Sequence, residues 1–439
     1  TGLPAVGSGS TSPASVPVIA LISVSDAAKA RTELDKLFKD AAAAGTKVAS
    51  ETIDGGTFWT LDSAPTTGPN PSQGHAAVAL TDNMIVVGDQ DALVKTSVAL
   101  GHGTGQTLAG SSTFTTAVGA LPEARLGTLY VDGAALKLAL APLASSQPGL
   151  DSALGAIPDR LAGSLRVADG AVTVEVRLPA PTGDSLLPVR ASSIADRVPG
   201  DSVAFLGVND LGKALHNLIT TAKTQLGSGS GAQQITTLEG ILGTSLESYL
   251  DWVGDSALVV RVAGGTPSGA IVALATDKAT AQTRLGQLQA VVALAGLDPS
   301  AGVHVATTDH GGTTITELTI DQAGGLKIGW ALRDDLFVLG VGEGSVAWVL
   351  DATADTSLAK SAAYNAALQA AGAKAGQGIM YVDLAGLRSS LEPLIPAGSK
   401  ATYERDVKPW LTPLGAFAAV GYVDGDSFVV RAVLSTQPQ

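Results

Sequence analysis

The feature that most constrains this fold is a phrase that the chain contains twice. "LYVDGAALKL", Leu129 to Leu138, returns as "MYVDLAGLRSSL", Met380 to Leu391. Four further blocks recur in the same order, each about 250 residues further on. They are "ALISVSDAAKARTEL" with "VALATDKATAQTRL", "ALTDNMIVVG" with "ALRDDLFVLG", "SSTFTTAVGAL" with "SAAYNAALQAA", and "RVADGAVTVEV" with "GYVDGDSFVV". Collinear blocks of this kind predict two copies of one structural unit.

The two copies are unequal in length, and this sets the predicted domain boundaries. We assign residues 1–180 to a first repeat, 181–190 to a linker and 191–439 to a second, complete repeat. The second copy has a lead-in containing "VPGDSVAFLGVND", and the first has no equivalent after Thr1. We expect the missing strand and helices to lie upstream of Thr1, beside any export signal. The alternative is that a neighbouring subunit completes the first repeat by strand addition.

Within the second copy, periodicity predicts a succession of hairpins. Three turns are expected, at His310-Gly311-Gly312, at Asp334-Asp335 and at Asp424-Gly425-Asp426. An amphipathic helix should begin after Asp277, which is placed to act as its N-cap. The predicted fold class is therefore α+β, with two homologous repeats, each a mainly antiparallel β-sheet of hairpins with helices packed on one face.

Composition excludes several classes of function. The chain has 27 basic and 40 acidic residues, a formal net charge of −13, and no basic cluster that could bind nucleic acid. It has no cysteine, which excludes disulfides, thiol nucleophiles and thiolate metal sites. No stretch approaches 18 uninterrupted apolar residues, so we expect membrane attachment only through a segment upstream of Thr1.

Two short patterns resemble those of known hydrolases. "GDSL" at Gly183 to Leu186 and "GVND" at Gly207 to Asp210 resemble blocks of an ester hydrolase family, in which the Ser is the nucleophile. The first block lies in a Pro-rich linker and no later Asp-x-x-His supplies a base, so we interpret both as turns. "SLAK", Ser357 to Lys360, fits the Ser-x-x-Lys pattern of penicillin-recognising enzymes but lacks their other two elements, and we interpret it as the polar start of a helix.

Metal and cofactor motifs are also weak. Of the histidines His75, His102, His216, His304 and His310, only the last two are close in sequence, and they need not face each other. Carboxylates for calcium are conceivable at Asp351 to Asp355 and at Asp424 and Asp426, but neither group has the spacing of an EF-hand. We therefore predict no catalytic, cofactor-binding or metal-ligating residue and no cofactor.

The repeated Asp132 and Asp383 suggest a carboxylate pair, but their context favours a structural role. Each stands between a predicted strand and a predicted helix, where Asp accepts hydrogen bonds from free backbone N–H groups. Asp210, at the end of "LGVND", occupies a third junction of the same type. We predict that all three cap helices.

Three stretches characterise the complete unit: "VPGDSVAFLGVNDLGKAL" at its start, "MYVDLAGL" near its end and "VDGDSFVVRAVL" in its closing hairpin. On these stretches the chain resembles a bacterial family of unknown function, DUF3352. The resemblance implies a cell-envelope protein with an export signal or a single membrane anchor, and it supplies no catalytic residues.

These observations together predict a non-enzymatic, extracytoplasmic protein that is secreted, surface-located or anchored by a segment upstream of Thr1. It would act by binding a hydrophobic or peptide ligand, or by structural assembly through self-association or another envelope protein. The alternative function is a hydrolase with an unrecognised active site.

Overall fold

The structure is a computed structural model, and it describes most of the chain. It covers residues 19–436 except 54, 63–74, 102, 104–106, 145–153, 156, 169, 181–189, 191, 227–229, 296–301 and 373–378. The chain divides into two compact units, Thr1–Thr116 and Ala117–Gln439. Each unit is considered by itself.

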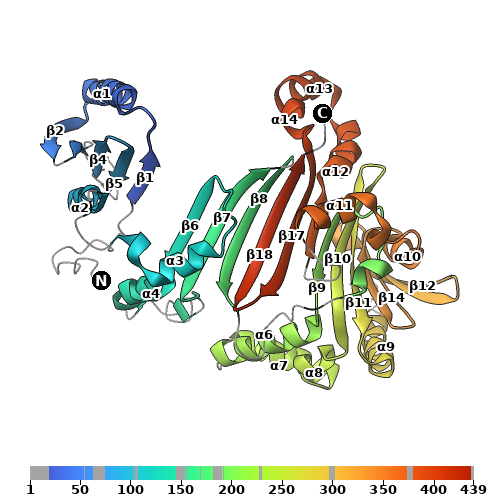
Figure 1. The fold of residues 1–439 in the computed structure, drawn as a ribbon. Coiled ribbons are helices and arrows are strands. Elements are labelled where there is room, and N and C mark those ends of the chain that lie inside the picture. The colour runs from blue at the N-terminus through green and yellow to red at the C-terminus, as the bar shows by residue number, and fades with distance from the viewer. Residues whose placement is uncertain are drawn as a thin grey trace. The chain divides into compact units, whose positions relative to one another are not determined.

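The first unit is built on a five-stranded antiparallel sheet with the order β1-β5-β4-β3-β2 (Figure 1). The strands are β1 (Ile19–Ser23), β2 (Lys47–Ile53), β3 (Gly56–Asp62), β4 (His75–Thr81) and β5 (Met84–Gly88). Helix α1 (Ala27–Ala43) follows β1, and α2 (Asp91–Gly101) follows β5. A 3₁₀ turn (Leu108–Gly110) comes next, and α3 (Ser112–Gly119) spans the division between the two units.

Helices cover both faces of this small sheet. Phe38 of α1 packs with Trp59, Val78 and Leu80, while Val94 and Val98 of α2 pack with Phe58, Ala77, Ala79 and Val86. Neighbouring residues on a strand, such as Val78 and Ala79, point to opposite faces. The expectation that helices pack on one face is therefore wrong for this sheet, because both of its faces are apolar and each needs a cover.

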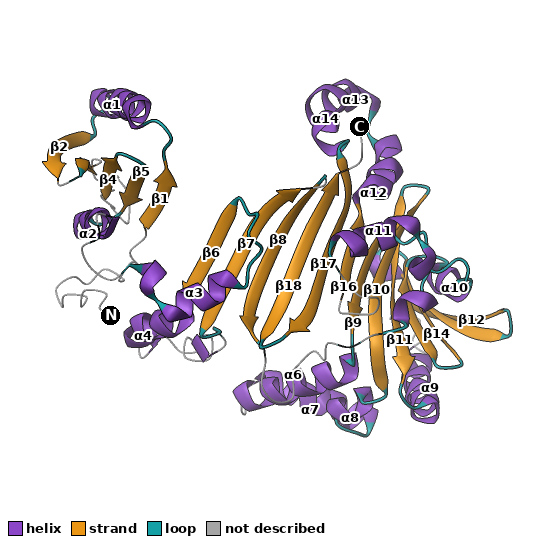
Figure 2. Cartoon of the chain, viewed as in Figure 1, coloured by secondary structure: helices purple, strands orange, loops and turns teal. Residues whose placement is uncertain are grey.

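The second unit is built on a single thirteen-stranded sheet (Figure 2). Its order is β12-β13-β14-β15-β11-β10-β9-β16-β17-β18-β8-β7-β6, and every neighbouring pair is antiparallel. The strands are β6 (Gly127–Asp132), β7 (Arg160–Ala168), β8 (Ala171–Pro179), β9 (Ala204–Val208), β10 (Val253–Ala263), β11 (Thr266–Ala275), β12 (Val303–His310), β13 (Thr313–Ile320), β14 (Leu326–Arg333), β15 (Leu336–Val341), β16 (Ile379–Asp383), β17 (Leu414–Asp424) and β18 (Ser427–Thr436).

The helices of this unit lie between strands in the sequence. They are α4 (Gly133–Ala144), α6 (Leu211–Leu226), α7 (Ser230–Leu242), α8 (Leu246–Leu250), α9 (Lys278–Ala295), α10 (Ser345–Leu350), α11 (Ala362–Ala370), α12 (Leu384–Leu391), α13 (Ala397–Thr402) and α14 (Lys408–Leu411). Short 3₁₀ turns lie at Ile194–Arg197, Asp321–Ala323, Leu358–Lys360 and Glu392–Leu394, and a π-helical turn lies at Tyr403–Val407. None of the described helices is both long and apolar enough to cross a lipid bilayer.

The main core lies on one face of the large sheet, which we call the covered face. Val259, Val272 and Val338 point into it from the strands. Trp348 and Val349 of α10, together with Tyr364 and Leu368 of α11, close it from above. We call the other face the open face. A smaller core lies on it, where Ala273 meets Ala281 of α9 and Trp252. Helices thus lie on both faces here too, contrary to the one-face expectation.

Local predictions for the second copy are confirmed. The turns between β12 and β13, between β14 and β15 and between β17 and β18 fall at the three predicted places. The backbone N–H groups of Ala279 and Thr280 donate to the Asp277 carboxylate at the start of α9. The observed fold is α+β with two antiparallel sheets, as predicted.

The order of elements from β11 to β18 repeats the order from β1 to β8. In the sheets, β11-β15-β14-β13-β12 has the same arrangement as β1-β5-β4-β3-β2, and β16-β17-β18 the same as β6-β7-β8. The predicted boundary at residues 181–190 does not coincide with the boundary between compact units, because β6, β7 and β8 share a sheet with the second copy.

Candidate functional site

The open face carries a row of aliphatic side chains that crosses most of the large sheet. Cross-strand register places Leu339, Ile271, Leu258, Leu206, Met380, Ala419, Ala432, Val174 and Leu165 directly beside one another on nine successive strands. At about 4.8 Å per strand, this row is about 40 Å long. No charged side chain interrupts it.

The row is partly open to solvent at both halves of the sheet. Its six large exposed members are between 40% and 46% exposed, and they are Leu165, Val174, Leu206, Leu258, Ile271 and Met380. Single exposed aliphatic residues are ordinary, but a contiguous row of them usually marks a surface that binds something. We call this set, with Leu339, Ala419 and Ala432, the aliphatic row.

At one end the row runs under helix α9, into a cleft of about 600 Å³. Register continues the row from Leu339 to Trp330 and then to Thr316. Trp330 lines the cleft and is only 6% exposed, so its side chain is packed against its neighbours. Gln282, Leu285, Gly286 and Gln289 line the cleft from α9, because residues three, four and seven apart share one side of a helix.

The cleft is lined mainly by uncharged polar groups. Gln282, Gln289, Thr314 and Thr316 offer amide and hydroxyl groups, and the Gln289 amide lies 3.5 Å from the Thr316 hydroxyl. Arg333 and Asp334 stand at its edge. Such a lining can form hydrogen bonds with a neutral, hydroxyl-bearing group, while the adjoining aliphatic row can contact only apolar chains. The cleft and the row together are the candidate functional site.

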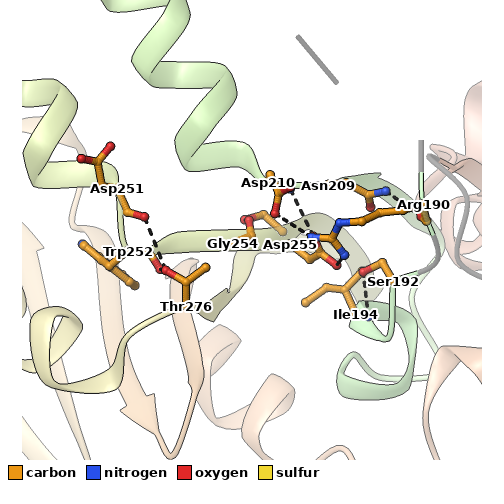
Figure 3. Close-up of polar contacts among 11 residues, drawn as sticks. Arg190, Ser192, Ile194, Asn209, Asp210, Asp251, Trp252, Gly254, Asp255 and Thr276 are labelled. Carbon is orange, nitrogen blue, oxygen red and sulfur yellow. Dashed lines mark hydrogen bonds and ion pairs between the residues drawn. The ribbon is translucent and has the colours of Figure 1, made fainter. Parts of the chain in front are cut away.

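A second polar cluster surrounds Arg190 (Figure 3). Its guanidinium donates to both carboxylate oxygens of Asp255 and to Asp210. The side-chain amide of Asn209 donates to the Arg190 carbonyl at 2.7 Å, and the backbone N–H of Asp210 donates to Asp255. The hydrogen bond to Asp210, and after it the one to Asp255, raises the pKa of Arg190 despite some desolvation.

This cluster brings together the "GVND" block and the Gly-Asp-Ser of residues 254–256, but its chemistry is that of a closed ion-pair network. Asp255 is only 6% exposed and is held by a bidentate contact, so its oxygens are occupied. The Ser256 hydroxyl donates to the Gly254 carbonyl instead of to a base. Residues 183–186, with the "GDSL" serine, lie outside the described part of the chain.

The Ser-x-x-Lys pattern does not form a nucleophile pair either. Ser357 is buried and its hydroxyl donates to the Ala354 carbonyl, whereas Lys360 is exposed. The turn Leu358–Lys360 is a 3₁₀ segment that follows a bridge between Ser357 and Pro199. These contacts anchor the turn to the covered face.

Each described histidine pairs with aspartate. His216 lies 3.1 Å from Asp251, His304 lies 2.9 Å from Asp321 and His310 lies 2.7 Å from Asp351. His75 contacts two carboxylates, of Asp62 and Asp91. His102 lies outside the described residues.

The suggested metal groupings are used in other ways. His304 and His310 are six residues apart on one strand, which separates them by about 20 Å. The Asp351 carboxylate contacts His310, and Asp424 accepts a hydrogen bond from Arg177. Among the described residues, no three His, Asp or Glu side chains are grouped to hold a metal ion.

The prediction that aspartates cap helices is confirmed at two of the three junctions. Asp132 accepts from the backbone N–H of Ala135 at 2.9 Å, and Asp383 accepts from that of Gly386 at 2.8 Å. It is wrong for Asp210, whose carboxylate pairs with Arg190 and whose backbone has φ of 46°. The sequence could not show this, because Arg190 is 20 residues away in the predicted linker.

Sequence reasoning missed the aliphatic row and the cleft. The alternation of apolar residues along each strand was visible, but it does not reveal which face a helix will cover. Fold and site together define an α+β protein with an extended antiparallel sheet, one face of which is partly open and aliphatic.

The chain matches the family described as "Protein of unknown function (DUF3352)" over residues 6–428, and it belongs to that family. No curated protein and no solved structure matches the chain significantly.

Proposed function

We propose that this chain is a non-enzymatic envelope protein that binds a single-chain amphiphile on the open face of its large sheet. The aliphatic row carries this proposal, because it is a continuous uncharged path that ends in a polar cleft. An extended alkyl chain would lie along Ile271, Leu258 and Leu206. A hydroxyl-rich head group would lie beside Gln289 and Thr316.

The chemistry of the row favours an alkyl chain over a protein partner. Its members are Leu, Ile, Val, Met and Ala, whereas protein interfaces are usually anchored by Trp, Tyr and Arg. Burial of apolar surface stabilises by about 25 cal/mol per Å², so half-exposed side chains along the row supply a driving force without specific contacts. The polar cleft then supplies orientation.

The location outside the cytoplasm rests on the resemblance to envelope proteins that the sequence carries. Fractionation of cells that produce the natural protein tests it. Recovery of the chain with surface or secreted material is expected, and recovery only with cytoplasmic proteins would contradict this part of the proposal.

Binding is tested by calorimetric titration with dodecyl maltoside below its micelle concentration. Leu258→Glu places a charge in the middle of the row at a half-exposed position, so the fold should survive and binding should weaken at least tenfold. Leu238→Glu is the matched control, because Leu238 is 44% exposed on α7 and outside the row. Equal binding by wild type and Leu258→Glu would overturn the proposed site.

Structural assembly is the competing role. If the row instead joins copies of the chain, Leu258→Glu would convert a sedimenting oligomer into a monomer in the absence of any amphiphile. In that case structural assembly, and not ligand binding, would be the role of the aliphatic row.

A further inference from the structure

The strand β6 lies at one end of the large sheet and, among the described strands, is paired on one side only. The strand reads "GTLYVD", so it has no charged residue before Asp132. Its own Leu129 is 52% exposed. The opposite edge, β12, carries His304, Asp309 and His310. Natural proteins blunt free sheet edges with charges of this kind, because an unpaired row of backbone N–H and C=O groups attracts further strands. Arg125, which precedes the strand, donates to the Thr128 hydroxyl, but no residue of β6 itself before Asp132 is charged.

The counterpart of β6 within the same sheet is β16, and β16 is not an edge. Both strands contain the Tyr-Val-Asp phrase, both precede a helix that their Asp caps, and both pair with the hairpin that follows. On its other side β16 pairs antiparallel with β9, with Met380 opposite Leu206 and Tyr381 opposite Phe205. Among the described strands, β6 pairs only with β7.

The five-stranded sheet shows the same contrast. Its edge β1, "IALIS", is uncharged and mostly exposed, whereas the other edge, β2, carries Lys47 and Glu51. The counterpart of β1 is β11, which pairs with β10. The two uncharged edges are therefore the strands whose counterparts are covered by β9 and β10.

We propose that β6 binds, as an added antiparallel strand, a peptide segment with the chemistry of β9. That strand is uncharged and alternates large and small residues, as in "AFLGV". By the register of β16 with β9, its Leu would lie opposite Leu129 on the open face, and its aromatic residue opposite Tyr130 on the other face. Backbone hydrogen bonds would provide most of the affinity, and the two side-chain positions the specificity.

The β9 strand of a second copy does not fit this role. It already pairs with β10 on one side and β16 on the other, so both of its backbone edges are occupied. The occupant must be a segment whose strand is free to pair.

The test uses a fluorescent synthetic peptide with the sequence of residues 199–210, "PGDSVAFLGVND", and the whole chain. Anisotropy should report saturable binding, and hydrogen exchange should slow in residues 127–132. Leu129→Lys, which places a charge on the exposed edge, should weaken binding at least tenfold. Val305→Lys on the opposite edge β12 is the matched control and should bind as the wild type does.

Absence of binding, or equal binding by Leu129→Lys, would overturn the proposal. It would also be overturned if the peptide-free chain sedimented as a dimer that Leu129→Lys dissociates, since β6 would then pair with its own copy. Leu129 lies outside the aliphatic row, so dodecyl maltoside binding is expected to be the same in wild type and Leu129→Lys. The two proposals can therefore fail separately.

Discussion

His75 shows how a single residue can tie three elements together. It begins β4, and its ring contacts Asp62 at the end of β3 and Asp91 at the start of α2. The hydrogen bond to Asp62, followed by the one to Asp91, raises the pKa of His75 above its ordinary value of 6.5. A group whose pKa is raised by folding stabilises the fold in its protonated form.

We therefore expect the stability of the first unit to fall as pH rises. The His75 contribution is fully present below about pH 6.5 and is lost as pH rises through the folded-state pKa. Urea unfolding followed by the fluorescence of Trp59, the only tryptophan before Thr116, measures this. In His75→Gln the fall should disappear, whereas His304→Gln should retain it. A fall of the same size in His75→Gln would assign the effect to another group.

Glu175 illustrates a charge that only the three-dimensional structure explains. It is 1% exposed on the covered face and accepts hydrogen bonds from Arg177 and Arg431. Glu175 lies opposite Arg431 in the ladder between β8 and β18. Each is the fifth residue of its strand, so equivalent positions of the two hairpins carry opposite charges and meet. In isolated hairpins Glu175 would keep only Arg177 as a partner, and Arg431 would lose Glu175.

Removing one member of this network should destabilise the large sheet strongly. Glu175→Gln leaves two arginines beside a neutral amide, and loss of a buried ion-pair partner costs about 3–5 kcal/mol. The double variant Glu175→Leu/Arg431→Leu should lose less than the sum of the two single variants, because it removes the Arg431 charge that loss of Glu175 alone would leave without this partner. Strictly additive unfolding free energies would show that the two residues do not interact.

At the scale of elements, the repeated Asp has a measurable role. Asp383→Ala removes the cap of α12 and should lower the free energy of unfolding by about 1 kcal/mol, whereas Asp383→Asn should be nearly neutral. Denaturant unfolding of the three proteins decides this. Equal losses in Asp383→Asn and Asp383→Ala would mean that the charge, and not the hydrogen bond, matters.

The elements of the second copy could largely be predicted from sequence, because their turns contain Gly and Asp at positions that favour tight turns. Gly311 and Gly312 both have positive φ, and Asp334 has φ of 55°, which the residue types permit. What could not be predicted is tertiary: that β18 pairs with β8, and that α9 lies over β13 and β14 and forms a cleft there. The periodicity of the sequence shows which residues share a face of a strand. It does not show which other strand pairs with it.

At the scale of the whole molecule, the large sheet crosses the boundary that the repeats predict. β18, in the predicted second repeat, pairs with β8 along nine residues of the ladder, from Ser427 to Ser435. If the chain were cut at residues 181–190, β18 would lose its partner β8, and its edge beside Arg431 would be open. A cut before Thr107 instead leaves α3 and the whole large sheet in one piece.

This yields a comparison between two fragments. Residues 107–439 should fold by themselves, unfold cooperatively and bind dodecyl maltoside like the whole chain. Residues 191–439 lack β6, β7 and β8, so the apolar β18 edge is exposed and Arg431 loses Glu175. We expect this fragment to unfold at lower denaturant concentration and to aggregate. If instead it were as stable as residues 107–439, the repeat and not the continuous sheet would be the unit of folding.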